Sequence, residues 1–270
     1  MGEVDAQPLL YPPLLKGGFQ GIVDSHCHLD DLRFEGALPS LLHRAGVAGL
    51  DHIIVPCSKP DRWGCVSPCE TMGVALHLAY AIHPWYCEGI NPETYHRLAC
   101  YLEHAVAVGE CGLDLGARGG DLAEQVTLLR NQLILADHFH LPVILHAHKA
   151  LDMLWGEVRN FPALRGVVHS FSGSFQQAKQ WVDHGFYLGV GARVTYANQR
   201  RFHAMIAAMP ASALLLESDA PDQSPQHWRG KNNEPALIVE TIRALAALRN
   251  VAGQALVDQC RKNSQELFKI

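Results

Sequence analysis

The chain has 270 residues, of which 48% are apolar and 18% charged, and its formal net charge is −5 with the histidines neutral. This length suits one large domain, because α/β barrels commonly exceed 200 residues as a single unit. No apolar run of about 18 residues occurs, so no membrane span is expected. The acidic balance argues against a broadly basic face for nucleic acid, but a local phosphate site stays open because metal ions can supply its positive charge.

We interpret residues 1–20 as an irregular N-terminal lead-in to a domain over 21–270. The lead-in lacks a basic start, and Pro12-Pro13 interrupts its short apolar stretch, so the pattern is not that of a secretory signal. The eight cysteines are scattered, and we expect them to be reduced and buried in a cytoplasmic protein. A monomer is the favoured oligomeric state.

Eight apolar runs recur along the chain and are expected to form strands. Most are continuous stretches of Val, Ile, Leu and Ala, which is typical of parallel strands covered by helices on both faces. The runs cover 21–26, 52–57, 77–83, 105–112, 142–146, 167–169, 186–190 and 214–219.

Each run is followed by a helical pattern. The clearest helix covers 121–139, where apolar residues recur at steps of three and four. Asp121 with Glu124 resembles a capping box, and Pro142 follows soon after the expected end. The other expected helices cover 37–48, 92–104, 150–160, 175–184, 199–208, 235–248 and 253–267.

This alternation, without linker or repeat, predicts a closed (β/α)8 TIM-type barrel that forms a single domain. An open doubly wound sheet is the alternative, but it usually has fewer strands and a glycine-rich phosphate loop after the first one. The only Gly-Gly pairs are Gly17-Gly18, before the first strand, and Gly119-Gly120 in a loop. The barrel is therefore favoured.

Ionisable residues stand at or near the carboxyl ends of most of these runs. In a barrel all such ends open on one face, where active sites lie. Burying these groups costs several kcal/mol unless something pairs with them, so we expect them to converge on one pocket. They are His26, His28, His83, Glu110, His146, His169, Glu217 and Asp219.

The first two histidines predict half of a metal site. Residues i and i+2 of a strand point to the same face, so His26 and His28 would project side by side. Imidazoles held in this way bind transition metals. Glu110 or Asp219 would complete the shell of this ion.

A second divalent ion would lie between His146 and His169, and Glu110 is well placed to bridge the two ions. The ligand types admit zinc, manganese, iron and magnesium. Two such ions clamp the attacking and leaving oxygens of a phosphodiester and make hydroxide available near neutral pH. Asp219 would contact a metal and take the proton from the attacking water.

These motifs resemble those of the TatD-type metal-dependent hydrolases, a family that includes magnesium-dependent deoxyribonucleases. The resemblance extends from 24 to 268. Its landmarks are DSHCHLD at 24–30, IHP at 82–84, GECGLD at 109–114, PVILH at 142–146, VHSFSG at 168–173, LESDAP at 216–221 and NEP at 233–235. It implies a distorted barrel of the amidohydrolase type that hydrolyses phosphodiester bonds in DNA, often as an exonuclease. The run HAHK at 146–149 and Ser218 depart from the family pattern and alter the rim of the site.

The resemblance also implies roles for single residues. It implies that His83 faces the substrate, although a hydrogen-bonded structural imidazole is the open alternative. It implies that Glu217 supports catalysis, and we favour an orienting contact with a ligand histidine over direct chemistry. The implied metal ligands are His26, His28, Glu110, His146, His169 and Asp219.

Residues beside the expected strand ends leave alternatives open. Asp114 and Arg118 would form a loop salt bridge or, less favoured, contact the substrate. Three aromatic candidates would stack on bases or, as we favour, pack within their loops. These are Trp85, Tyr86 and Trp228.

The preferred hypothesis is therefore a two-metal phosphodiesterase whose partner is DNA. The alternative is an amidohydrolase-like enzyme that uses the same binuclear site on a small ester, lactone, amide or phosphate ester. The acidic net charge and the lack of a basic stripe support this alternative. A non-catalytic binding barrel is disfavoured, because the ligand set is complete.

Overall fold

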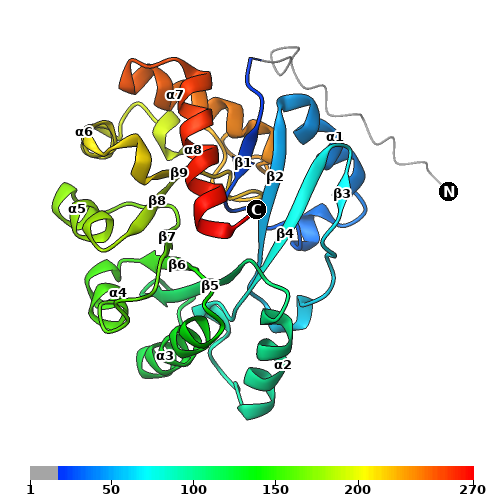
Figure 1. Cartoon of the computed structure of the whole chain (residues 1–270), viewed down its shortest axis with the longest axis vertical. Helices are drawn as coiled ribbons and strands as arrows, with labels where there is room; N and C mark the ends of the chain where they lie inside the picture. Colours follow the sequence, from blue (N-terminus) through cyan, green and yellow to red (C-terminus); the bar gives the residue numbers. More distant parts are fainter. Residues whose placement is uncertain (1–17) are drawn as a thin grey trace.

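The computed structural model describes residues 18–270, so the lead-in expected over 1–20 lies outside the described residues except at 18–20. Eight parallel strands follow one another round a ring in chain order (Figure 1). They are β1 (Ile22–Asp24), β2 (Leu50–Cys57), β4 (Val74–Tyr80), β5 (Ala107–Asp114), β6 (Val143–His148), β7 (Gly166–Val168), β8 (Phe186–Val190) and β9 (Leu214–Leu216).

Two backbone hydrogen bonds at the ends of β1 and β9 bring the last strand beside the first and nearly close the ring. Ser25 N donates to Leu216 O, and Asp219 N donates to His26 O, each over 2.9 Å. The predicted (β/α)8 barrel is confirmed.

The described chain has eight helices; seven lie around the ring of strands, and α8 lies across one end of it (Figure 1). Every expected helix is present, with its ends displaced by a few residues at most. They are α1 (Leu38–Ala48), α2 (Pro92–Leu102), α3 (Leu122–Phe139), α4 (Leu151–Val158), α5 (Phe175–Asp183), α6 (Arg200–Ala208), α7 (Ile238–Arg249) and α8 (Gly253–Phe268). The Asp121 carboxylate caps α3 by accepting from Ala123 N and Glu124 N.

The expectation that a helix follows each strand is wrong after β2. A 3-10 turn (Pro60–Arg62) and the short strand β3 (Glu70–Thr71), antiparallel to β4, occupy this connection. Two prolines and two glycines fall within 60–73, and both residue types destabilise a helix interior.

The inside of the barrel is a small apolar core that α8 closes from one end. Six strands contribute one side chain each, and two residues from the end of α8 cover them. The set is Ile54, Ala79, Ala107, Ile144, Val167, Leu215, Leu267 and Phe268. Because α8 covers the amino ends of the strands, their carboxyl ends form the face that is open for chemistry.

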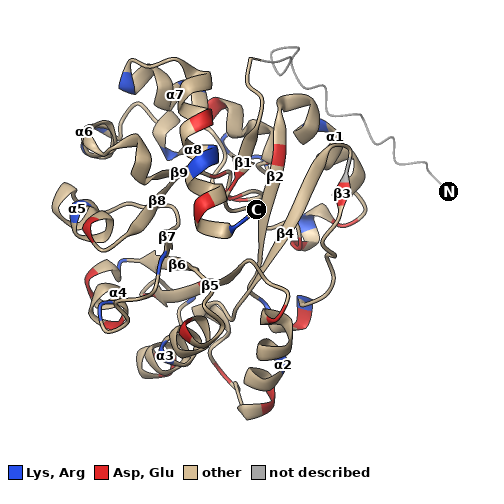
Figure 2. Ribbon diagram, in the orientation of Figure 1, with Lys and Arg blue, Asp and Glu red and all other residues tan. Residues whose placement is uncertain are grey.

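Charged residues lie mostly on the helices and loops around the ring, with acidic and basic residues interspersed (Figure 2). No helix among residues 18–270 is long and apolar enough to cross a membrane. All eight cysteines are free, and five are buried. The expectation of burial is wrong for the exposed Cys65, Cys69 and Cys100.

Candidate metal centre

The chain stays extended beyond β1 because neighbouring strands hold its backbone. Cys27 N donates to Ile54 O of β2 over 3.1 Å, and His28 N donates to Ala220 O beyond β9 over 2.8 Å. This keeps His26 and His28 on one face, as their spacing predicts. Their Nε2 atoms lie 3.1 Å apart.

Glu110 enters the barrel from an irregularity in β5. Gly109 pairs with Ile144 and Cys111 with Leu145, so Glu110 has no partner in the ladder to β6. Such a bulge redirects a side chain, and bulges are common beside active sites. The Glu110 carboxylate is buried at the carboxyl end of the barrel, with 3% of the residue exposed.

The first subsite consists of His26, His28, Asp219 and Oε2 of Glu110. Oε2 of Glu110 lies 3.5 Å from Nε2 of each histidine. Oδ1 of Asp219 lies 3.6 Å from the same two atoms. Four ligands at 2.0–2.1 Å in a tetrahedron are about 3.3–3.4 Å apart, so these donor atoms fit one divalent ion.

The second expected subsite comprises Oε1 of Glu110 with His146 and His169. Each histidine forms a candidate ligand group with Glu110, but in two different groups, one with His26 and His169 and one with His83 and His146. Oε1 lies 2.7 Å from His146 Nδ1 and 3.1 Å from His169 Nε2. The His169 ring stacks on His26 with 3.9 Å between centroids, so the two subsites adjoin. All six expected ligands are thus brought together, and Glu110 presents a different oxygen to each subsite.

His83 lies beside the second subsite, where it accepts a hydrogen bond from the backbone. Its Nδ1 accepts from Trp85 N over 3.2 Å, and burial lowers its pKa to about 3. The neutral ring therefore carries its proton on Nε2, which lies 3.8 Å from Glu110 Oε1. His83 lies close enough to Glu110 and His146 for the three residues to form a third potential ligand group. A protonated Nε2, however, has no lone pair for a metal.

Asp114 contacts a ligand histidine rather than Arg118. Its Oδ2 accepts from Trp85 Nε1 over 2.7 Å and lies 3.1 Å from His146 Nε2. A carboxylate at the far nitrogen of a ligand histidine fixes the orientation of the ring. The Arg118 guanidinium lies over the Trp85 ring instead, 4.7 Å from its centroid, so the expected loop salt bridge is wrong.

Glu217 lies behind His169, away from the cavity. Its Oε1 accepts from Ser170 N over 2.6 Å and lies 3.6 Å from His169 Nδ1. Its carboxylate packs against Gly189, where a Cβ atom would come within 2.2 Å of Oε2. This placement favours an orienting role for Glu217 over direct chemistry.

Asp219 is held in a left-handed backbone conformation, with φ of 54°, which Asp tolerates better than most residues. Gln223 Nε2 donates to its Oδ2. Burial raises the pKa of Asp219 to about 6, although His169 and His28 oppose the shift.

The pKa values of Glu110 and His169 depend on the opposite charges that surround each of them. Burial opposes ionisation of Glu110, but His169, His26 and His83 outweigh it and hold the pKa of this carboxyl well below its usual range. Burial disfavours charge on His169, yet the carboxylates around it raise its pKa. Cations would displace these protons, as metal binding at such ligands generally does.

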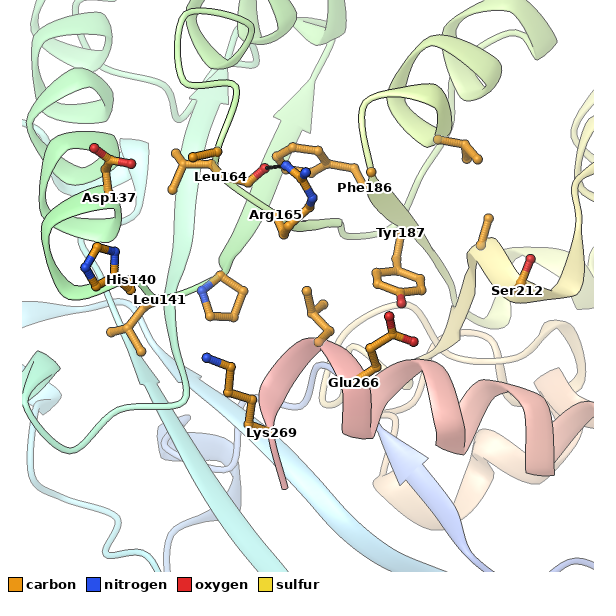
Figure 3. A pocket seen from close by; sticks show the side chains of 16 residues that line it. Asp137, His140, Leu141, Leu164, Arg165, Phe186, Tyr187, Ser212, Glu266 and Lys269 are labelled. Carbon is orange, nitrogen blue, oxygen red and sulfur yellow. Dashed lines mark hydrogen bonds between the residues drawn. The ribbon is translucent and has the colours of Figure 1, made fainter.

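The cluster forms the floor of a cavity of about 650 Å³ at the carboxyl end of the barrel. Its wall includes Lys59, Trp85, Tyr86 and Arg118. A second cavity, of about 490 Å³, lies near the amino ends of β6 to β9 (Figure 3). Barrel enzymes place their chemistry at the carboxyl face, and the three potential metal-ligand groups found among residues 18–270 lie there. We therefore assign the site to the first cavity.

The barrel and its histidine–carboxylate cluster together define a metal-dependent hydrolase. The family model described as TatD related DNase matches residues 23–269. An uncharacterized metal-dependent hydrolase of Escherichia coli K12, YjjV, is 35% identical over 253 residues, covering 92% of this chain and 98% of its own. The chain therefore belongs to the TatD family.

Solved structures agree with this assignment. The crystal structure of the Escherichia coli TatD homologue YjjV superposes with a TM-score of 0.85 at 34% identity, covering 92% of this chain and 98% of that one. A TatD family hydrolase from Entamoeba histolytica reaches a TM-score of 0.78 at 20% identity, covering 93% and 99%. The second likeness shows the shared fold alone.

Proposed function

We propose that this protein is a binuclear metal-dependent phosphodiesterase that acts on DNA. The observation that carries the proposal is the shared carboxylate of Glu110. Its Oε2 lies 3.5 Å from Nε2 of His26, and its Oε1 lies 2.7 Å from Nδ1 of His146. A carboxylate that faces two histidine pairs with different oxygens is suited to bridging two cations.

The donor atoms are imidazole nitrogens and carboxylate oxygens, which accept zinc, manganese, iron or magnesium. When bound, two such ions polarise the phosphoryl group, lower the pKa of water and stabilise the oxygens of an in-line displacement.

The chain itself supplies proton transfer and orientation. Asp219 accepts the proton of the attacking water, and the Gln223 amide holds its carboxylate in place. His83, neutral and protonated on Nε2, donates a hydrogen bond to an oxygen of the substrate. Asp114 and Glu217 orient the two histidines of the second subsite.

A metal analysis of untreated protein, paired with a nuclease assay, tests this function. We expect about two equivalents of metal and the release of nucleotides from single-stranded DNA. Chelation should abolish release, and at least one of the four metals should restore it. If none of them supports nucleotide release, the protein is not a deoxyribonuclease.

An amidohydrolase-like enzyme acting on small molecules is the second candidate. The cavity of about 650 Å³ favours it, because this volume is within the range of small-ligand pockets. A panel of small esters, lactones, amides and phosphate esters in the same assay separates the two. Turnover of a panel member without nucleotide release would support the second candidate.

A further inference from the structure

Two cations on one wall of the cavity have aromatic rings as their partners. Lys59 Nζ lies 5.7 Å from the centroid of the Tyr86 ring, and the Arg118 guanidinium lies 4.7 Å from that of Trp85. Both rings come from one 3-10 turn, Pro84–Tyr86, directly after His83. All four side chains line the same cavity as the metal-ligand cluster.

Among the described residues, Lys59 and Arg118 have no carboxylate within salt-bridge distance. Arg33 also lines this cavity, but unlike Lys59 and Arg118 it has carboxylate partners. Two carboxylates, Asp31 and Asp222, accept its hydrogen bonds over 2.8–2.9 Å and neutralise it. The cationic wall, Lys59 with Arg118, therefore concentrates positive charge on one side of the cavity of an acidic protein.

Contact with a ring leaves a cation free to bind an anion. An aromatic face attracts the charge through its quadrupole and does not consume the N–H donors in conventional hydrogen bonds. Arg118 thus keeps the planar donors that match phosphate oxygens, and Lys59 keeps a compact point charge.

The wall is connected to the second subsite. Trp85, which carries Arg118 on its ring, donates from Nε1 to Asp114 Oδ2 over 2.7 Å. Asp114 Oδ2 lies 3.1 Å from His146 Nε2. Trp85 and Asp114 therefore link Arg118 by contact to the cluster that would hold the reacting phosphate.

We propose that Lys59 and Arg118 bind the phosphate next to the scissile one, so that the enzyme selects oligonucleotides over substrates with a single phosphodiester. The inference rests on the proposed phosphodiesterase activity, and it adds the determinant of substrate choice. The reacting phosphate would occupy the metal-ligand cluster. The cationic wall is separate from this cluster, so it would bind a second, neighbouring phosphate.

Three matched substrates test the inference with metal-loaded enzyme. They are the thymidine dinucleotide with one phosphodiester, and the same compound with an added 5′-terminal or 3′-terminal phosphate. All three contain the same scissile bond, so a difference in kcat/KM reports the additional phosphate alone. We expect at least one phosphorylated form to be preferred about tenfold or more, as a charge-assisted contact of about 1.4 kcal/mol gives.

Removing the cations should remove this preference. The ratio of kcat/KM between phosphorylated and unphosphorylated substrates should fall toward one in the Lys59→Ala, Arg118→Ala double variant. Lys59→Arg should retain much of it, because the charge remains. With longer single strands, the slope of log KM against log salt should fall by about 0.7 in the double variant, the value for one phosphate contact.

Lys262→Ala on α8 and Arg159→Ala after α4 are matched controls, because they remove the same charges from exposed positions outside the cavity. Both should keep the preference. Equal turnover of the three substrates by the wild type, or a preference that survives in the double variant, would overturn the inference alone. Failure of the wild type to release nucleotides from single-stranded DNA with any of the four metals would instead overturn the proposed function.

Discussion

Replacing Glu110 with glutamine tests whether one carboxylate serves two ions. The substitution Glu110→Gln keeps the size of the side chain and one carbonyl oxygen, but it replaces the other oxygen with an NH2 group. In the wild type, Oε2 lies 3.5 Å from Nε2 of His26 and His28, and Oε1 lies 2.7 Å from Nδ1 of His146. One subsite would keep its ligand and the other would lose it. We expect one equivalent of metal where the wild type holds two.

The expected thermal effect follows from the length of the chain. An ion at 100 times its Kd stabilises the native state by about 2.7 kcal/mol. An unfolding entropy of about 2.1 cal/mol/K per residue gives about 0.57 kcal/mol/K for 270 residues. Each ion should therefore raise Tm by about 5 °C. The wild type should gain about 10 °C on metal addition, and Glu110→Gln about 5 °C.

The assay combines metal content with thermal unfolding, before and after addition of each metal to chelator-treated protein. Glu110→Ala should lose metal and activity together while the fold persists, because the substitution lies at the barrel mouth. Glu124→Gln, at an exposed position of α3, is the matched control and should behave as the wild type. Two equivalents of metal and a full thermal shift in Glu110→Gln would refute the shared-carboxylate interpretation.

Three further substitutions test buried carboxylates in and beside the cluster. Asp219→Asn should keep much of its metal but lose turnover by about 10²–10⁴, measured as kcat at saturating metal, and full activity would contradict its role as proton acceptor. Glu217→Gln should weaken metal affinity about 10–100-fold in a competition titration, with kcat recovering as metal is raised. Burial raises the pKa of Asp24 to about 7, so the contribution of this group to the stability of the metal-free wild type should be lost as pH rises from about 4 to 7. Asparagine does not titrate, so the unfolding free energy of Asp24→Asn minus that of the wild type should increase by roughly 3 kcal/mol from pH 5 to pH 8. Denaturant titrations at the two pH values measure this difference.

The strands could be located from the sequence because each is buried on both faces and carries a continuous apolar run. The run at 186–190 coincides with β8 (Phe186–Val190). Strand β1 ends at Asp24, two residues before its expected end, because the chain beyond it pairs with its neighbours only through isolated hydrogen bonds. Strand β3 has two residues and no apolar run, so a pattern of buried residues could not indicate it.

The residue types of the site could be predicted, but their contacts could not. The ends of apolar runs identified Glu110, whereas its position between two subsites depends on a bulge that composition does not reveal. Asp114 looked like a loop residue. Its position four residues after Glu110 in an extended run was the available signal, because alternate strand residues share a face. The tautomer of His83 depends on the N–H of Trp85, which only the structure places beside it.

The cluster also explains why the metal-free protein should be less stable than the metal-bound protein. Within residues 18–270, eight buried side-chain atoms have no hydrogen-bond partner, and four of them belong to residues in or beside the cluster. These are in Asp24, His26, His169 and Glu217. Unpaired buried polar groups cost stability, and ionised groups brought together without a counter-charge cost more. These four atoms do not face the subsites, so a cation leaves them unpaired; it does supply the counter-charge for Glu110 and Asp219, in the native state only. Metal binding therefore contributes to folding as well as to chemistry. Because protons compete for the same imidazoles and carboxylates, metal affinity and the stability that it supplies should rise together with pH.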